Sequence, residues 1–109
     1  MDCIFCKITS GGLPCRKAYE DDELLAFHDI SPQAPVHVIL IPKRHVANIN
    51  GLSAELAARM VQAAVQIAKE QGVENGWRIV SNCGEEAGQT VHHMHFHILG
   101  GRQLSTTVG

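Results

Sequence analysis

The chain has 109 residues, of which 45% are hydrophobic and 18% are charged, and this composition predicts one folded domain over residues 1–109. Its formal charge of -2 argues against nucleic acid as a partner, because proteins that bind nucleic acid usually carry a basic surplus. The apolar runs are too short to cross a bilayer, so no membrane partner is expected.

The first half of the chain predicts one short helix, three strands and a proline-rich loop. In chain order these elements cover residues 3–9 (helix), 15–20 and 24–29 (strands), 29–35 (loop) and 36–42 (strand). The loop at 29–35 is assigned because its prolines are excluded from helix interiors, and the strand at 36–42 because β-branched residues favour strands.

The second half predicts a long helix over residues 53–72 and two further strands at 77–82 and 91–99. Ser53 suits the N-cap of this helix, and Gly72 suits its C-terminal stop. Its apolar stripe has helical spacing and consists of Leu56, Met60, Ala64 and Ile67. About five strands and two segregated helices predict an α+β fold with a largely antiparallel sheet.

Four of the seven histidines lie between positions 92 and 97. Successive side chains of a strand point to opposite faces, so the last strand places three imidazoles on one face and three apolar side chains on the other. The imidazoles are His93, His95 and His97, and the apolar residues are Met94, Phe96 and Ile98.

Three interpretations of this row of imidazoles compete. The first is a solvated polar face, and the second is a catalytic zinc site with three histidine ligands. The third is a phosphate site in which a neutral imidazole attacks phosphorus. The adjoining residues Gly88, Gln89 and Thr90 favour phosphate, because they offer main-chain N–H groups, an amide and a hydroxyl beside the row.

The segments "AFHDISPQAPVHVILIPKRH" and "GQTVHHMHFHILGGRQ" carry a resemblance to a known family. The histidine pattern at 93–99 resembles the signature of the histidine-triad superfamily, and both segments are similar to its Hint branch, the purine nucleoside phosphoramidases. The resemblance implies hydrolysis of the P–N bond of a nucleoside 5′-monophosphoramidate. The reaction passes through a nucleotidyl-histidine, releases AMP or GMP and an amine, and requires no metal.

The resemblance also implies catalytic roles. His95 matches the nucleophile, whose other ring nitrogen is held by a main-chain group near the third histidine, and His97 matches the residue that contacts the phosphate. His93 is the first histidine of the triad. Thr90 stands where the family usually has serine and keeps a hydroxyl for protonating the leaving amine. His37 resembles a histidine behind the triad that relays a proton, although a buried structural histidine is the alternative.

The same resemblance implies a nucleotide-binding site. Its residues are Leu13, Phe27, His28, Asp29, Ile30, Asn82, Gly88, Gln89, Thr90, His95 and His97. Asp29 is expected to accept hydrogen bonds from both ribose hydroxyls, and its alternative role is a turn cap. Core packing is the alternative for Phe27 and Ile30.

Cys3 and Cys6 form a C-x-x-C pair, which is weak evidence for a metal by itself. The N-terminal residues show no secretory-signal pattern, so a cytoplasmic location and reduced thiols are expected. Some bacterial members of the family hold a zinc with such a pair and two histidines, which match His45 and His93 here. This closed site would be structural, and it would withdraw His93 from proton relay.

Three other activities compete with the phosphoramidase. They are a nucleotide-binding regulatory module, a diadenosine-polyphosphate hydrolase and a hydrolase with a catalytic zinc on three histidines. Family members form homodimers, so a second copy of this chain is the expected protein partner and a purine nucleotide of the AMP type the expected ligand.

Overall fold

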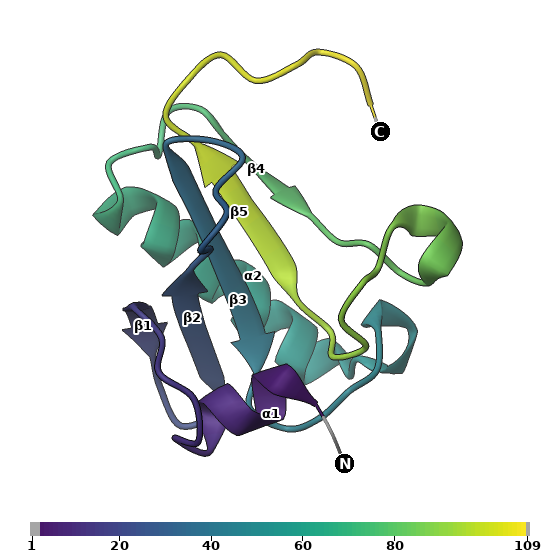
Figure 1. Ribbon diagram of the computed structural model, residues 1–109. Coiled ribbons are helices and arrows are strands. Elements are labelled where there is room, and N and C mark those ends of the chain that lie inside the picture. Colours follow the sequence, from purple (N-terminus) through teal and green to yellow (C-terminus); the bar gives the residue numbers. More distant parts are fainter. Residues whose placement is uncertain (1–2, 109) are drawn as a thin grey trace.

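An antiparallel sheet forms the centre of the structure, a computed structural model that describes residues 3–108 (Figure 1). Within these residues, its strands are β1 (Lys17–Glu20), β2 (Leu24–His28), β3 (Val36–Pro42), β4 (Trp77–Val80) and β5 (Phe96–Gly100). Their order across the sheet is β1-β2-β3-β5-β4, and every neighbouring pair is antiparallel. The expected α+β fold with a five-stranded antiparallel sheet is therefore confirmed.

Helix α2 (Ala54–Glu70) packs on one face of the sheet. Ser53 caps its N-terminus, because the Ser53 hydroxyl accepts a hydrogen bond from the Leu56 N–H at 3.1 Å. Gly72 follows the helix with φ +76°, a conformation that favours glycine. The predicted stripe is buried, and it packs with Val38, Leu40, Met94, Phe96 and Ile98 of the sheet.

The opposite face carries the short helix α1 (Ile4–Thr9), which lies across the end of the sheet where β3 finishes (Figure 1). Phe5, the buried residue of α1, packs there against Leu25, Phe27, Ile39 and Ile41. Because side chains alternate along β3, odd-numbered residues of this strand face α1 and even-numbered residues face α2. The face under α1 therefore presents His37 and Ile39.

The last strand is shorter than predicted, because β5 begins at Phe96 rather than at 91. The ladder with β3 ends where Phe96 pairs with Leu40, and β3 itself ends at Pro42, which has no N–H to donate. The preceding residues bond elsewhere: the Met94 N–H donates to the Val46 carbonyl at 2.6 Å. His93 and His95 therefore lie outside the sheet ladder, although Met94 is buried in the α2 core as expected.

Two short 3₁₀ helices complete the described residues, η1 (Ile49–Gly51) and η2 (Glu85–Ala87). None of the helices within residues 3–108 is long and apolar enough to span a membrane.

Candidate active site

A row of paired residues across the sheet positions the site. Phe27 of β2 pairs with Ile39 of β3, and Ile39 pairs with His97 of β5, so the three side chains share the face that carries α1. Phe5 lies over this row, with its ring centroid 5.6 Å from that of Phe27 and 5.2 Å from that of His95. A single aromatic side chain thus bridges the apolar part of the site and the histidines.

His95 is held in one tautomer by its own segment of chain. Its Nδ1–H donates to the carbonyl of His93 at 2.7 Å, so Nε2 carries the lone pair. The expectation that this acceptor lies near the third histidine is wrong, because the first histidine provides it. The chain leaves the sheet ladder between 93 and 95, which frees this carbonyl to accept from a ring two residues further on.

His97 is oriented by a chain of hydrogen bonds that begins at Gln33. The Gln33 N–H donates to Nδ1 of His37 at 3.0 Å, so the His37 proton resides on Nε2, which lies 2.9 Å from Nδ1 of His97. The neutral His97 ring therefore carries its own proton on Nε2. Burial lowers the pKa of His97 to about 4, with a further contribution from the nearby rings of His95 and His37.

Asp29 caps the turn that follows β2 and also approaches His37. Its Oδ1 accepts from the Ser31 N–H at 2.7 Å, and its Oδ2 lies 3.4 Å from Nε2 of His37. Burial lowers the pKa of His37, and the Asp29 carboxylate opposes this shift. The turn cap is thus present, and ribose binding by the same carboxylate stays a prediction.

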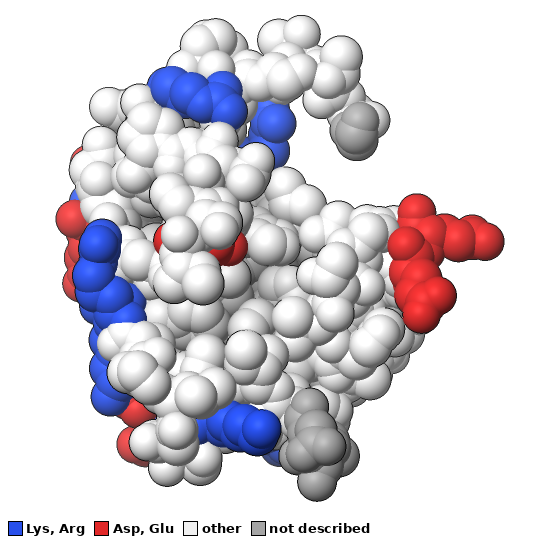
Figure 2. Space-filling view, viewed as in Figure 1, with Lys and Arg blue, Asp and Glu red and all other residues white. Residues whose placement is uncertain are grey.

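An apolar cavity of about 630 Å³ adjoins the row of paired residues. Its lining includes all five residues expected around the nucleoside: Leu13, Phe27, His28, Asp29 and Ile30. Ile4, Phe5, Ile8, Pro14, Cys15, Arg16, Pro32 and Ile39 also line it and were missed from the sequence. Figure 2 shows charged side chains mainly at the margins of this view, with little charge at its centre.

The side-chain amides of Gln89 and Asn82 stabilise the loop that precedes the three histidines. Gln89 is buried, its Oε1 accepts from the Gly84 N–H, and its Nε2 donates to the carbonyls of Ala47 and Val91. Asn82 braces the same loop by donating from Nδ2 to the Ala87 carbonyl at 2.7 Å. The Gln89 amide is therefore committed to main-chain partners at both its oxygen and its nitrogen, whereas Asn82 uses only its Nδ2 in this way. Nucleotide binding by these two residues stays a prediction.

Gly88 and Thr90 complete the loop. Gly88 has φ +84°, a left-handed conformation that L side chains rarely adopt. Thr90 is exposed at the end of the loop, two residues beyond this turn. Their contact with phosphate stays a prediction.

The four residues expected to bind zinc converge. The ligand atoms of Cys3, Cys6, His45 and His93 all lie within 4.8 Å of one another. Nδ1 of His93 lies 3.3 Å from Sγ of Cys3 and 3.6 Å from Sγ of Cys6, and Nδ1 of His45 lies 3.3 Å from Sγ of Cys6. A tetrahedral zinc with ordinary bond lengths separates sulfur and nitrogen ligands by about 3.6 Å, so the cluster fits the metal.

His93 is prepared for this role by its other nitrogen. Its Nε2–H donates to the Pro42 carbonyl at 2.7 Å, which leaves the lone pair on Nδ1 facing the two sulfurs. Burial lowers the pKa of His93, which keeps the ring neutral, as a metal ligand must be. Cys15 and Cys83 are free thiols outside the cluster.

The competing catalytic zinc on three histidines is wrong, because the triad rings face three different partners. His93 faces the cysteines, while His95 and His97 bond through Nδ1 to a carbonyl and to His37 respectively. Asp29, His37 and His97 also lie close together, but Nε2 of His37 carries a proton there and has no lone pair for a metal. Hydrogen bonding accounts for this second cluster.

Comparisons with known proteins identify the family of this chain. A family model described as HIT domain matches residues 10–104. The chain is 44% identical over 111 residues to an uncharacterized HIT-like protein of Synechococcus elongatus, a match that covers 99% of this chain and 97% of the relative. The chain therefore belongs to the histidine-triad (HIT) family.

Solved structures show the same fold. A HIT family hydrolase from Legionella pneumophila has a TM-score of 0.95 at 43% identity, covering 99% of this chain and 100% of that one. A HIT family hydrolase from Clostridium thermocellum has a TM-score of 0.94 at 42% identity, covering 98% and 96%.

The low pKa of His97 predicts a loss of stability in mild acid. Between pH 6.5 and 4 the unfolded chain binds a proton at this residue that the folded chain does not, so the free energy of unfolding falls as the pH falls through this range. His97→Gln should weaken that dependence in urea denaturation with EDTA, whereas His92→Gln at an exposed site should not. Equal pH dependence of wild type and His97→Gln would contradict the assignment.

Proposed function

We propose that this protein hydrolyses purine nucleoside 5′-monophosphoramidates. The observation that carries the proposal is the hydrogen bond from Nδ1 of His95 to the His93 carbonyl, since it leaves a lone pair on Nε2 of a neutral ring. The names of the two hydrolase structures support a hydrolase in general. The cleavage of a P–N bond is our more specific proposal.

The reaction proceeds in two displacements at phosphorus. In the first, Nε2 of His95 bonds to the α-phosphorus while the P–N bond breaks, and the amine leaves with that electron pair and a proton from the Thr90 hydroxyl. In the second, the oxygen of a water molecule bonds to phosphorus while the bond to Nε2 of His95 breaks and its electron pair returns to the ring; the water gives one proton to the Thr90 oxygen, and the nucleoside monophosphate leaves. The neutral His97 ring donates from Nε2 to a phosphate oxygen in both steps.

The apolar cavity receives the nucleoside. Leu13, Phe27 and Ile30 offer apolar surface to a purine, and the cavity is large enough for one nucleoside. Each oxygen of Asp29 keeps a lone pair beyond its present contact, so the carboxylate accepts hydrogen bonds from two ribose hydroxyls while it caps the turn.

The four-ligand cluster holds a structural zinc in this proposal. Cys3, Cys6, His45 and His93 fill the tetrahedral shell, so the ion supplies stability and leaves no position for a reacting water. It links the N-cap of α1 to the segment that bears His95. His93 then binds metal through Nδ1 and takes no part in proton transfer, while the chemistry itself uses no metal.

The protein is proposed to act as a homodimer. Strand β4 is an edge of the sheet, and Val61 and Val65 are about half exposed on the outer face of α2, so both surfaces suit a second copy. None of the four cysteines forms a disulfide in the described residues, which suits a reducing compartment such as the cytoplasm.

Replacing the nucleophile tests the reaction. His95→Ala should lower the turnover of adenosine 5′-phosphoramidate by several orders of magnitude with EDTA present, because the described site offers no second imidazole with this orientation. Release of AMP is the measurement, and His92→Ala, which alters an exposed histidine, is the control.

Two outcomes would count against the reaction. A near-normal rate in His95→Ala would exclude the histidine mechanism. If the wild type bound AMP but did not turn over the phosphoramidate, a nucleotide-binding module would be favoured. If it turned over only diadenosine polyphosphates, a diadenosine-polyphosphate hydrolase would be favoured.

Removing the thiols tests the metal. Cys3→Ser with Cys6→Ser should abolish bound zinc in elemental analysis and lower the urea midpoint, because both sulfur ligands are lost. Measurable phosphoramidase activity should persist, since the ion is structural. Cys83→Ser is the matched control outside the cluster, and equal zinc content in wild type and the double variant would refute the site.

A further inference from the structure

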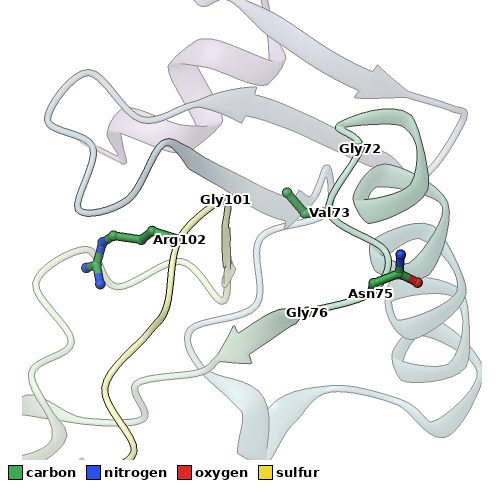
Figure 3. Close-up of a pocket in the computed structure, with 6 residues that line it drawn as sticks. All are labelled: Gly72, Val73, Asn75, Gly76, Gly101 and Arg102. Carbon is green, nitrogen blue, oxygen red and sulfur yellow. The ribbon is translucent and has the colours of Figure 1, made fainter.

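Arg102 joins two distant parts of the chain next to the active site. Its Nη2 donates to the Gln33 carbonyl at 2.9 Å, across a separation of 69 residues, and its Nη1 donates to the Gln103 carbonyl. Figure 3 shows the Arg102 side chain extending away from Val73 and Asn75, although Arg102 contributes to the lining of the shallow hollow beside them. The guanidinium therefore serves a contact with the 29–35 loop.

The turn before Arg102 is built for this contact. Gly101 has φ +95°, and a Cβ added there would lie 2.9 Å from Cβ of Pro35. Only glycine fits both the backbone conformation and the close approach to the loop. Directly after β5, the chain therefore packs closely on the 29–35 loop, to which Arg102 is hydrogen-bonded.

Gln33 carries the constraint from Arg102 to the histidines. Its carbonyl accepts from Arg102, while its N–H donates to Nδ1 of His37. The Gln33 side chain also ties the loop by donating from Nε2 to the Ser31 carbonyl at 3.1 Å. Because His37 is buried, its tautomer is set by the few groups that reach the ring: the Gln33 N–H at Nδ1 and the Asp29 carboxylate, 3.4 Å from Nε2, both favour a proton on Nε2.

We propose that Arg102 is a positioning residue: by holding Gln33, it keeps His37 as the Nε2–H tautomer and thereby keeps His97 as an N–H donor toward the phosphate. The effect on rate rests on the proposed function, whereas the effect on tautomers does not. Without the clamp, His37 also populates the Nδ1–H tautomer. Nε2 of His37 then accepts from Nδ1 of His97, and Nε2 of His97 presents a lone pair to the anionic phosphate.

The test compares three variants of the full-length protein. Arg102→Met removes the donors at similar side-chain length, and Arg102→Lys keeps a cation that can reach the carbonyl. Arg78→Met is the matched control, because Arg78 also donates to a main-chain carbonyl, that of Ser105, without contacting the 29–35 loop. Long-range ¹H–¹⁵N spectra of the ligand-free protein report which nitrogen of His37 and of His97 bears the proton.

Wild type, Arg102→Lys and Arg78→Met should show a single Nε2–H tautomer at His37, and Arg102→Met should show a mixture. With phosphoramidate substrate, kcat of Arg102→Met should fall in proportion to the fraction of His37 in the Nδ1–H tautomer, roughly 2-fold for an equal mixture, while KM changes less. Arg102→Lys should recover most of that loss.

If folded Arg102→Met kept the wild-type positions of the protons on the His37 and His97 rings, the proposal would be overturned whether or not kcat fell. A lower kcat alone would show only a structural role. A mixed tautomer in Arg102→Met together with no phosphoramidase activity in wild type would support the positioning role and refute the proposed function. The two failures are therefore distinguishable.

Discussion

The bond between Nδ1 of His95 and the carbonyl of His93 is the contact on which the site depends. It exists because the chain leaves the sheet ladder just before Phe96, so a carbonyl that a strand would have paired accepts from an imidazole instead. The surrounding structure keeps this segment in place. Met94 anchors it in the α2 core, and Phe5 packs on the rings of His93 and His95 from the other side.

Three neighbouring histidines acquire three different properties from their hydrogen bonds. His93 donates to a carbonyl through Nε2 and presents Nδ1 to the cysteines, whereas His95 donates through Nδ1 and presents Nε2 to the site. His97 accepts through Nδ1 and therefore presents an N–H. In the proposed function, one residue type thus serves as metal ligand, nucleophile and hydrogen-bond donor, because the protein fixes the tautomer of each ring.

Local patterns in the sequence predicted most of the elements and the row of histidines, whereas the roles of the site residues came from the resemblance to a known family. The apolar stripe and cap of α2, the β-branched β3 and the alternation at Met94, Phe96 and Ile98 are short-range signals that burial enforces. The late start of β5, at Phe96 instead of residue 91, escaped prediction, because it depends on Pro42 of another strand.

The residues that were missed share the same difficulty. Phe5 contacts His95 from a short helix 90 positions earlier in the chain, and Arg102 reaches Gln33 across 69 residues. Neither contact leaves a periodic or spaced pattern in the sequence, since only the folded chain brings the partners together. Gln89 was predicted for its chemistry, whereas its buried amide braces the loop.

The central claim is covalent catalysis by His95, and trapping the intermediate tests it most directly. Wild-type protein would be mixed with a phosphoramidate, quenched in alkali during turnover and examined by intact mass and peptide mapping, since a phosphorus–nitrogen adduct survives alkali. The account predicts one nucleotidyl group per chain, attached to His95. Turnover with no adduct, or with an adduct on another residue, would contradict it.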